Sequence, residues 1–148
     1  MAIKVLVVDD SGFFRRRILE ILKPVSAIEV VGTAANGREA IEQVKNLKPD
    51  VVTMDYEMPI MDGMQLGKRI KSRIEWQTTK VVLMLSGRVK ESAETTEMGE
   101  FDGVLSKPIY ESQLSDLLRT MLGEVSEQQT AFEKETSRRS KSEKAAIR

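Results

Sequence analysis

Acidic residues follow two short apolar runs of this sequence, where each run ends. Asp9 and Asp10 come directly after Ile3–Val8, and Asp55 comes directly after residues 51–54. If these runs are neighbouring strands of a parallel sheet, three carboxylates, here called the acidic cluster, meet at one edge of that sheet. Such a cluster is repulsive unless a cation neutralises it, and an all-oxygen ligand set with room for water favours Mg²⁺. The alternative for Asp9 and Asp10 is that they cap the following helix and complement its dipole.

Two further polar residues close later apolar runs. Ser86 follows Lys80–Leu85, and Lys107 follows the run that includes Val104. By itself Lys107 has the pattern of an ordinary surface lysine. An acid pair, a single acid, a hydroxyl and a lysine nevertheless stand at the ends of the first, third, fourth and fifth apolar runs along the chain, and this joint pattern predicts one shared site. The chain contains no histidine and no cysteine, so its chemistry depends on carboxylates, hydroxyls, lysine and a metal.

The arrangement of apolar runs predicts the scaffold that brings these residues together. Stretches with helical spacing alternate with five short runs rich in β-branched residues: Ile3–Val8, Ile28–Ala34, 51–54, Lys80–Leu85 and 104–105. Alternating strands and helices indicate an α/β fold with a doubly wound parallel sheet that is covered on both faces. Right-handed crossovers then place the carboxyl ends of all the strands at one edge.

We expect five helices between and after these strands. Ser11 can cap the first helix and Asn36 the second. The third extends over about residues 62–74, and the fourth, around residues 89–98, has few apolar anchors. The last is the clearest, because residues 114–122 place leucine and methionine at helical spacing along one face.

Length and composition limit the classes of function. A chain of 148 residues with 41% hydrophobic residues is expected to form one domain with a tail. Lys plus Arg equals Asp plus Glu at 23 each, so no overall charge attracts the chain to nucleic acid or to a membrane. The apolar run Ile3–Val8 is too short for a signal core or a membrane span, and we expect a cytoplasmic protein.

The composition changes near residue 123. We expect a domain over residues 1–122 and a charged tail over residues 123–148, where large apolar residues are few. One interpretation is a solvated, partly disordered tail. The alternative is a continuation of the last helix that pairs with a partner or with a second copy of the chain as a homodimer.

Four stretches together resemble the receiver domain of two-component response regulators, over roughly residues 2–122. They are VLVVDDS (5–11), DVVTMDYEMPIMDG (50–63), VVLMLSG (81–87) and LSKPI (105–109), and their order and spacing are specific. The resemblance implies a flavodoxin-like sheet with strand order 2-1-3-4-5. The first two stretches look most like those of chemotaxis receivers.

The resemblance also implies a role for each polar residue. Asp55 would accept a phosphoryl group, and Mg²⁺ would be held by the acidic cluster and the backbone carbonyl of Glu57. Ser86 and Lys107 would contact the phosphoryl oxygens. These roles agree with chemistry, because a carboxylate is a competent nucleophile that gives an acyl phosphate, and because phosphoryl transfer mainly needs positioning and neutralisation of charge.

The implied partner is a sensor histidine kinase or a histidine phosphotransfer protein, since the chain has no histidine of its own. Phosphorylation would then change the affinity for a downstream protein target. The chain would act as a self-phosphorylating and self-dephosphorylating switch, and not as an enzyme. No basic patch or recognition helix follows residue 122, which argues against direct DNA binding.

Four residues concern how the phosphorylation site is tuned and how a partner recognises it. Val104 occupies the place where most receivers have an aromatic switch residue, three positions before the lysine. Glu57 and Arg88 flank the site in this family, where they would either form an ion pair that shields the phosphoryl group or remain two solvated charges. Phe13 falls off the apolar stripe of the first helix, and it would either dock the partner that donates the phosphoryl group or pack partly buried.

Two other classes of function compete with this one. A haloacid-dehalogenase-type phosphatase also uses an aspartate nucleophile, but its two aspartates stand one residue apart, whereas Asp9 and Asp10 are adjacent. A nucleotide- or flavin-binding α/β protein is the third candidate. No G-x-x-x-x-G-K-[ST] or G-x-G-x-x-G loop supports it.

Overall fold

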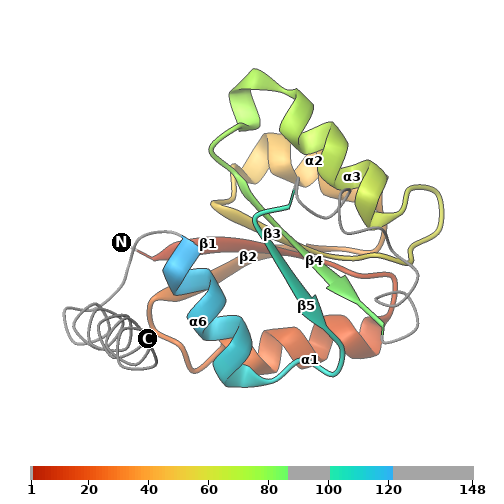
Figure 1. Ribbon diagram of the computed structural model, residues 1–148. Helices are drawn as coiled ribbons and strands as arrows, with labels where there is room; N and C mark the ends of the chain where they lie inside the picture. The colour runs from red at the N-terminus through yellow and green to blue at the C-terminus, as the bar shows by residue number, and fades with distance from the viewer. Residues whose placement is uncertain (1, 87–100, 122–148) are drawn as a thin grey trace, which may run out of the picture.

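Five parallel strands form a single sheet in the order β2-β1-β3-β4-β5 (Figure 1). The computed structural model describes residues 2–86 and 101–121. The strands are β1 (Ile3–Val8), β2 (Ile28–Ala34), β3 (Val51–Asp55), β4 (Lys80–Leu85) and β5 (Gly103–Ser106). The helices are α1 (Gly12–Leu22), α2 (Gly37–Leu47), α3 (Gly63–Ser72), the short 3₁₀ helix η1 (Ile74–Trp76) and α6 (Glu111–Met121).

Helices cover the sheet on both faces, with α1 and α6 on one face and α2 and α3 on the other (Figure 1). Side chains alternate between two cores along each central strand. In β1, Val5 and Val7 pack with buried residues of α1 and α6, whereas Leu6 and Val8 pack with buried residues of α2 and α3. A strand that is buried on both faces needs apolar residues at almost every position. This explains why the strands appear in the sequence as continuous apolar runs.

Side-chain caps fix where the first three helices begin. Ser11 accepts a hydrogen bond from the backbone N–H of Phe14 at 3.3 Å, and Asn36 caps α2 in the same way. Asp62 and Gln65 form a capping box at the start of α3. Because each cap follows a strand end by only a few residues, it also fixes the path of the loop at that edge of the sheet.

The third helix is shorter than the sequence predicts. We expected it to extend to residue 74, but α3 ends at Ser72 because Arg73 has an extended backbone (φ −94°, ψ 129°). Ile74 then starts η1 with its side chain 85% exposed. The predicted end of this helix at residue 74 is therefore two residues too far along the chain.

The α/β class, the doubly wound topology and the strand order are confirmed. Residues 2–86 and 101–121 contain four of the five expected α-helices. The expected helix at residues 89–98 and the tail at residues 123–148 lie outside that range, so the domain boundary at residue 122 stays a prediction. No helix in the described part of the chain is long and apolar enough to cross a membrane.

Candidate functional site

The acidic cluster forms at the carboxyl edge of the sheet, where β1 and β3 lie side by side. Val8 and Met54 are register partners, so the residues that follow them, Asp9 and Asp55, also lie next to each other. Asp9 is completely buried, Asp55 is 8% exposed and Asp10 is exposed. Each of the three offers a carboxylate oxygen, and these oxygens lie within 4.8 Å of one another. The residues described here therefore form an oxygen-ligand group that can hold a metal ion.

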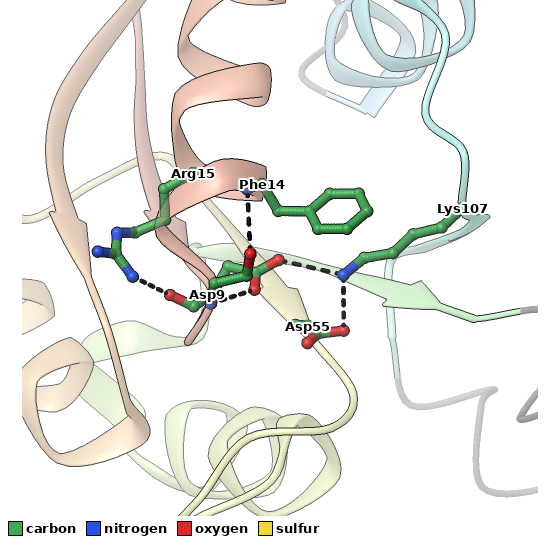
Figure 2. Close-up of polar contacts among 6 residues, drawn as sticks. Asp9, Phe14, Arg15, Asp55 and Lys107 are labelled. Carbon is green, nitrogen blue, oxygen red and sulfur yellow. Dashed lines mark hydrogen bonds and ion pairs between the residues drawn. The ribbon is translucent and has the colours of Figure 1, made fainter.

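Lys107 joins the two buried carboxylates (Figure 2). Its Nζ lies 3.2 Å from Asp9 Oδ2 and 3.2 Å from Asp55 Oδ1. Its backbone N–H donates to the carbonyl of Leu85 at 2.7 Å, which ties the end of β5 to the end of β4. The side chain is only 14% exposed, so water screens these ion pairs weakly. A single ammonium thus contacts both of the buried negative charges.

Backbone contacts hold Asp9 in place beneath this lysine. Its Oδ1 accepts a hydrogen bond from the N–H of Ser11 at 2.9 Å, and its carbonyl accepts one from Arg15 Nη1 at 2.6 Å (Figure 2). The cap of α1 is Ser11, so the alternative that Asp9 or Asp10 serves as the helix cap is wrong. Both aspartates are available to the cluster.

A cavity of about 460 Å³ opens beside the cluster. The residues that line it come from α1, from the ends of β3 and β4, and from the segment after β5: Phe14, Asp55, Glu57, Ser86, Lys107 and Pro108. The predicted carboxylate, hydroxyl and ammonium thus border the same space. That space is large enough for a phosphoryl group or another small oxyanion together with water.

Electrostatics show that the cluster is short of positive charge. Burial and, to a lesser extent, the neighbouring charge of Asp9 together raise the pKa of Asp55 to about 6, although Lys107 opposes both effects. Burial also raises the pKa of Asp9, against the hydrogen bond from Ser11 and the charge of Lys107. Loss of hydration disfavours the charged form of a carboxyl group. A divalent cation would relieve this deficit, and the donor set fits a hard ion of that kind.

The loop after β3 is held tightly against the site. A Cβ at Gly63 would lie 2.5 Å from the carbonyl oxygen of Asp55, so only glycine fits there without displacing the chain. Two residues earlier, Met61 N–H donates to the carbonyl of Pro59 at 2.7 Å, which closes a three-residue turn around Ile60. Ile60 has φ 74°, a region that β-branched residues rarely adopt. The loop therefore stores backbone strain next to the phosphoacceptor candidate.

The structure tests some of the remaining sequence predictions and leaves others open. Phe13 is 76% exposed, so the packed alternative for it is wrong. Val104 lies in β5 and packs against one core from a partly buried position. Arg88 lies outside the described residues, and its pairing with Glu57, whose side chain is exposed, stays a prediction.

Sequence reasoning missed one residue of the site. Phe14 was not singled out from the sequence as a site residue. It is half-buried, and the centroid of its ring lies 3.7 Å from Lys107 Nζ. The only signal in the sequence was its position in the first turn after the acid pair, where a helix that leaves a strand end passes over the site.

Comparison with known proteins decides the family. The model of the response regulator receiver domain matches residues 5–119. The chain belongs to the response regulator receiver domain family. This receiver is 58% identical, over 96 residues, to protein-glutamate methylesterase/protein-glutamine glutaminase 2 of Pseudomonas fluorescens. The match covers 65% of this chain but only 25% of that relative, so the chain spans about a quarter of its length.

Solved structures of receivers have the same fold. The response regulator domain of Thermotoga maritima CheB is 32% identical, with a TM-score of 0.72 over 83% of this chain and 98% of that one. The receiver domain of the sensor histidine kinase PA1611 from Pseudomonas aeruginosa has a TM-score of 0.73 at 19% identity, over 83% of this chain and 99% of that one. That structure has a magnesium ion coordinated in its active-site cleft.

The raised pKa of Asp55 predicts a pH-dependent stability. The folded value of about 6 lies above the unfolded value of about 3.9, so folding favours the protonated acid. This contribution is complete below the unfolded pKa and is lost as the pH rises through about 6. In metal-free buffer, Asp55→Asn should therefore raise the free energy of unfolding at pH 7.5 by roughly 2 kcal/mol, with little gain at pH 4. Denaturant titrations at both pH values measure it.

Asp50→Asn is the matched control, because Asp50 is an exposed acid immediately before the opposite end of β3. Because Asp50 lies away from the acidic cluster, Asp50→Asn does not relieve the repulsion between Asp9 and Asp55 and should not reproduce the gain in stability at pH 7.5. An Asp55→Asn variant with the same change in stability at both pH values would contradict the electrostatic explanation.

The strained turn predicts that Ile60→Gly stabilises the protein. Glycine adopts a positive φ without steric cost, and the side chain that is lost is 68% exposed and buries little area. The free energy of unfolding should rise by about 1 kcal/mol. Ile74→Gly, at an exposed isoleucine outside such a turn, should lower it. Equal losses in both variants would show that the turn is not strained.

Proposed function

We propose that Asp55 accepts a phosphoryl group from a phosphohistidine and that the chain is a switch in two-component signal transduction. The observation that supports this most directly is the ammonium of Lys107, which lies 3.2 Å from a buried carboxylate beside a cavity that Ser86 also lines. A nucleophile, a fixed positive charge and a hydroxyl donor around one space suit phosphoryl transfer, where neutralisation of charge matters most.

In the proposed reaction, a carboxylate oxygen of Asp55 forms a bond to phosphorus while the bond between phosphorus and the histidine nitrogen breaks. The products are an acyl phosphate and a neutral imidazole on the donor. Lys107 would move its contact from the carboxylate to a phosphoryl oxygen, and the hydroxyl of Ser86 would donate to another. Hydrolysis of the acyl phosphate by water restores the carboxylate.

The metal in this proposal is Mg²⁺, held by the acidic cluster and the backbone carbonyl of Glu57. The all-oxygen donor set and the excess of buried negative charge support it. When bound, Mg²⁺ would supply positive charge to the phosphoryl oxygens. The magnesium in the PA1611 receiver agrees with this assignment.

The proposed partners are a sensor histidine kinase or a histidine phosphotransfer protein as donor and a downstream protein as target. The similarity to CheB-type receivers supports a chemotaxis-type pathway in the cytoplasm. Neither nucleic acid nor a membrane is proposed as a partner, whereas pairing of two copies through α6 and residues 123–148 remains a proposal. On this view the receiver domain acts as a switch rather than as an enzyme.

Incubation with acetyl phosphate and Mg²⁺, followed by intact-mass measurement, tests the proposal. One phosphoryl adduct should appear in the unmodified chain, and Asp55→Asn should remove it. Lys107→Met should slow its formation by at least tenfold, because the fixed positive charge at the phosphoryl oxygens is lost.

Asp50→Asn is again the control and should keep the adduct at an unchanged rate. Chelation of Mg²⁺ should prevent the adduct in every variant. Rapid turnover of small phosphate esters with no lasting adduct would instead support the phosphatase alternative and contradict a switch.

The exposed ring of Phe13 predicts a donor-specific defect. Phe13→Ala should slow phosphoryl transfer from a phosphorylated histidine phosphotransfer protein by about tenfold, as expected for an aromatic contact at a protein interface. Phosphorylation by acetyl phosphate should change little, since that donor needs no docking surface. Stopped transfer reactions followed on denaturing gels give both rates.

Ile74→Ala is the control for exposure, because Ile74 is 85% exposed in η1, which precedes the amino end of β4 and is therefore remote from the site. It should affect neither donor. Equal slowing of both donors by Phe13→Ala would mean that Phe13 supports the site itself and not a partner.

A further inference from the structure

The ring of Phe14 covers the ammonium group of Lys107. Figure 2 shows the ring from α1 and the lysine from the segment after β5 turned toward each other. The ring centroid lies 3.7 Å from Nζ, well inside the range of a cation–π contact. The same Nζ lies 3.2 Å from one oxygen of Asp9 and 3.2 Å from one of Asp55. One ammonium thus has an aromatic face and two carboxylates as neighbours.

A neighbouring ring can restrict the position of a lysine ammonium, and this matters more for lysine than for a rigid side chain. The ammonium of lysine sits at the end of four rotatable carbons, and its hydration in water competes with any fixed position. The carboxylates attract it before reaction, but the charge and shape of Asp55 change once a phosphoryl group is attached. The contact between the ring and the ammonium does not involve Asp55, so it can persist whether or not Asp55 carries a phosphoryl group.

The ring is itself held in place by local structure. The N–H of Phe14 donates to the side chain of Ser11, the cap of α1, so the residue belongs to a fixed first turn. Its ring meets that of Phe13 edge to face, with centroids 5.9 Å apart and an interplanar angle of 89°. Phe14 also lines the cavity beside Asp55. Because the cap of α1 fixes the backbone of Phe14 independently of Phe13, the ring of Phe14 can act as a rigid support at this cavity.

We propose that Phe14 is a positioning residue for phosphoryl transfer: its ring face holds the ammonium of Lys107 where the incoming phosphoryl oxygens need it. The electron density of the ring, and not only its volume, then determines how fast Asp55 is phosphorylated. This inference rests on the proposed function. An apolar wall of the cavity would be the simpler role, and it would require volume alone.

Fluorinated phenylalanines separate the two roles. Successive fluorine atoms weaken the attraction of a ring for a cation while its size hardly changes. Phenylalanine analogues with one, two and three ring fluorines, incorporated at position 14, should lower the initial rate of phosphorylation by acetyl phosphate and Mg²⁺ in steps. The total loss should be about threefold to tenfold. A flat series overturns the proposal.

The same analogues at position 101 provide the control. Phe101 lies against Gly67 of α3 and packs on one core, away from the cavity. Fluorination there should leave the rate unchanged. An equal stepwise loss at position 101 would show a general effect of fluorine and would overturn the role of Phe14.

A second readout needs neither metal nor phosphodonor. The ¹⁹F resonance of 4-fluorophenylalanine at position 14 should shift when Lys107→Met removes the ammonium from the ring face. Lys4→Met, at an exposed lysine near the opposite end of β1, should not move it. No shift in Lys107→Met would show that ring and ammonium are not in contact.

The order of experiments separates failure of this inference from failure of the proposed function. An unmodified chain that takes up no phosphoryl group, with Mg²⁺ and acetyl phosphate present, overturns the function and this inference with it. Normal uptake that is lost in Asp55→Asn, together with a flat fluorine series, overturns the role of Phe14 alone.

Discussion

Two carboxylates buried side by side are the constraint on which the rest of this site depends. Asp9 follows β1, and Asp55 is the last residue of the adjacent parallel strand β3, so the fold holds the two carboxylates close together. Burial raises the pKa of both, which means that the folded chain accepts their charge at a cost. Lys107, which follows β5 at the same edge of the sheet, offsets part of that cost through its ion pairs with both carboxylates. The remaining deficit of positive charge suits the metal ion and the phosphoryl chemistry proposed for this site.

The sheet creates this constraint through its strand order. The chain proceeds from β1 outward to β2 and then returns to β3 on the other side, so the order reverses beside β1. Loops on the two sides of that reversal diverge and leave a crevice at the carboxyl ends of the strands. The caps at Ser11 and Asp62 and the close approach of Gly63 to Asp55 fix the paths of the loops that follow β1 and β3. The apolar strands and the helices on both faces of the sheet therefore hold the polar residues of the site at the carboxyl edge.

The sequence allowed prediction of what depends on burial and periodicity. Strands covered on both faces must be apolar throughout, so β1 and β4 were predicted to the residue, and with them the positions of the acids, Ser86 and Lys107. Local conformation was less accessible, because the spacing of apolar residues does not encode the extended backbone at Arg73 or the positive φ of Ile60. The contact between Phe14 and Lys107 joins residues 93 positions apart in the chain, and a helical stripe cannot reveal it.

The aromatic residue at this site comes from a different element than the family pattern implies. Val104 in β5 provides no ring, and Phe101 packs on α3. The ring that touches the site's lysine belongs to α1, and its edge-to-face neighbour is the exposed Phe13. Two contacting rings thus connect the Lys107 ammonium with an exposed aromatic surface. If Phe13 docks the donor and Phe14 positions Lys107, as proposed, recognition of the donor and positioning of this charge would be coupled within one turn of α1.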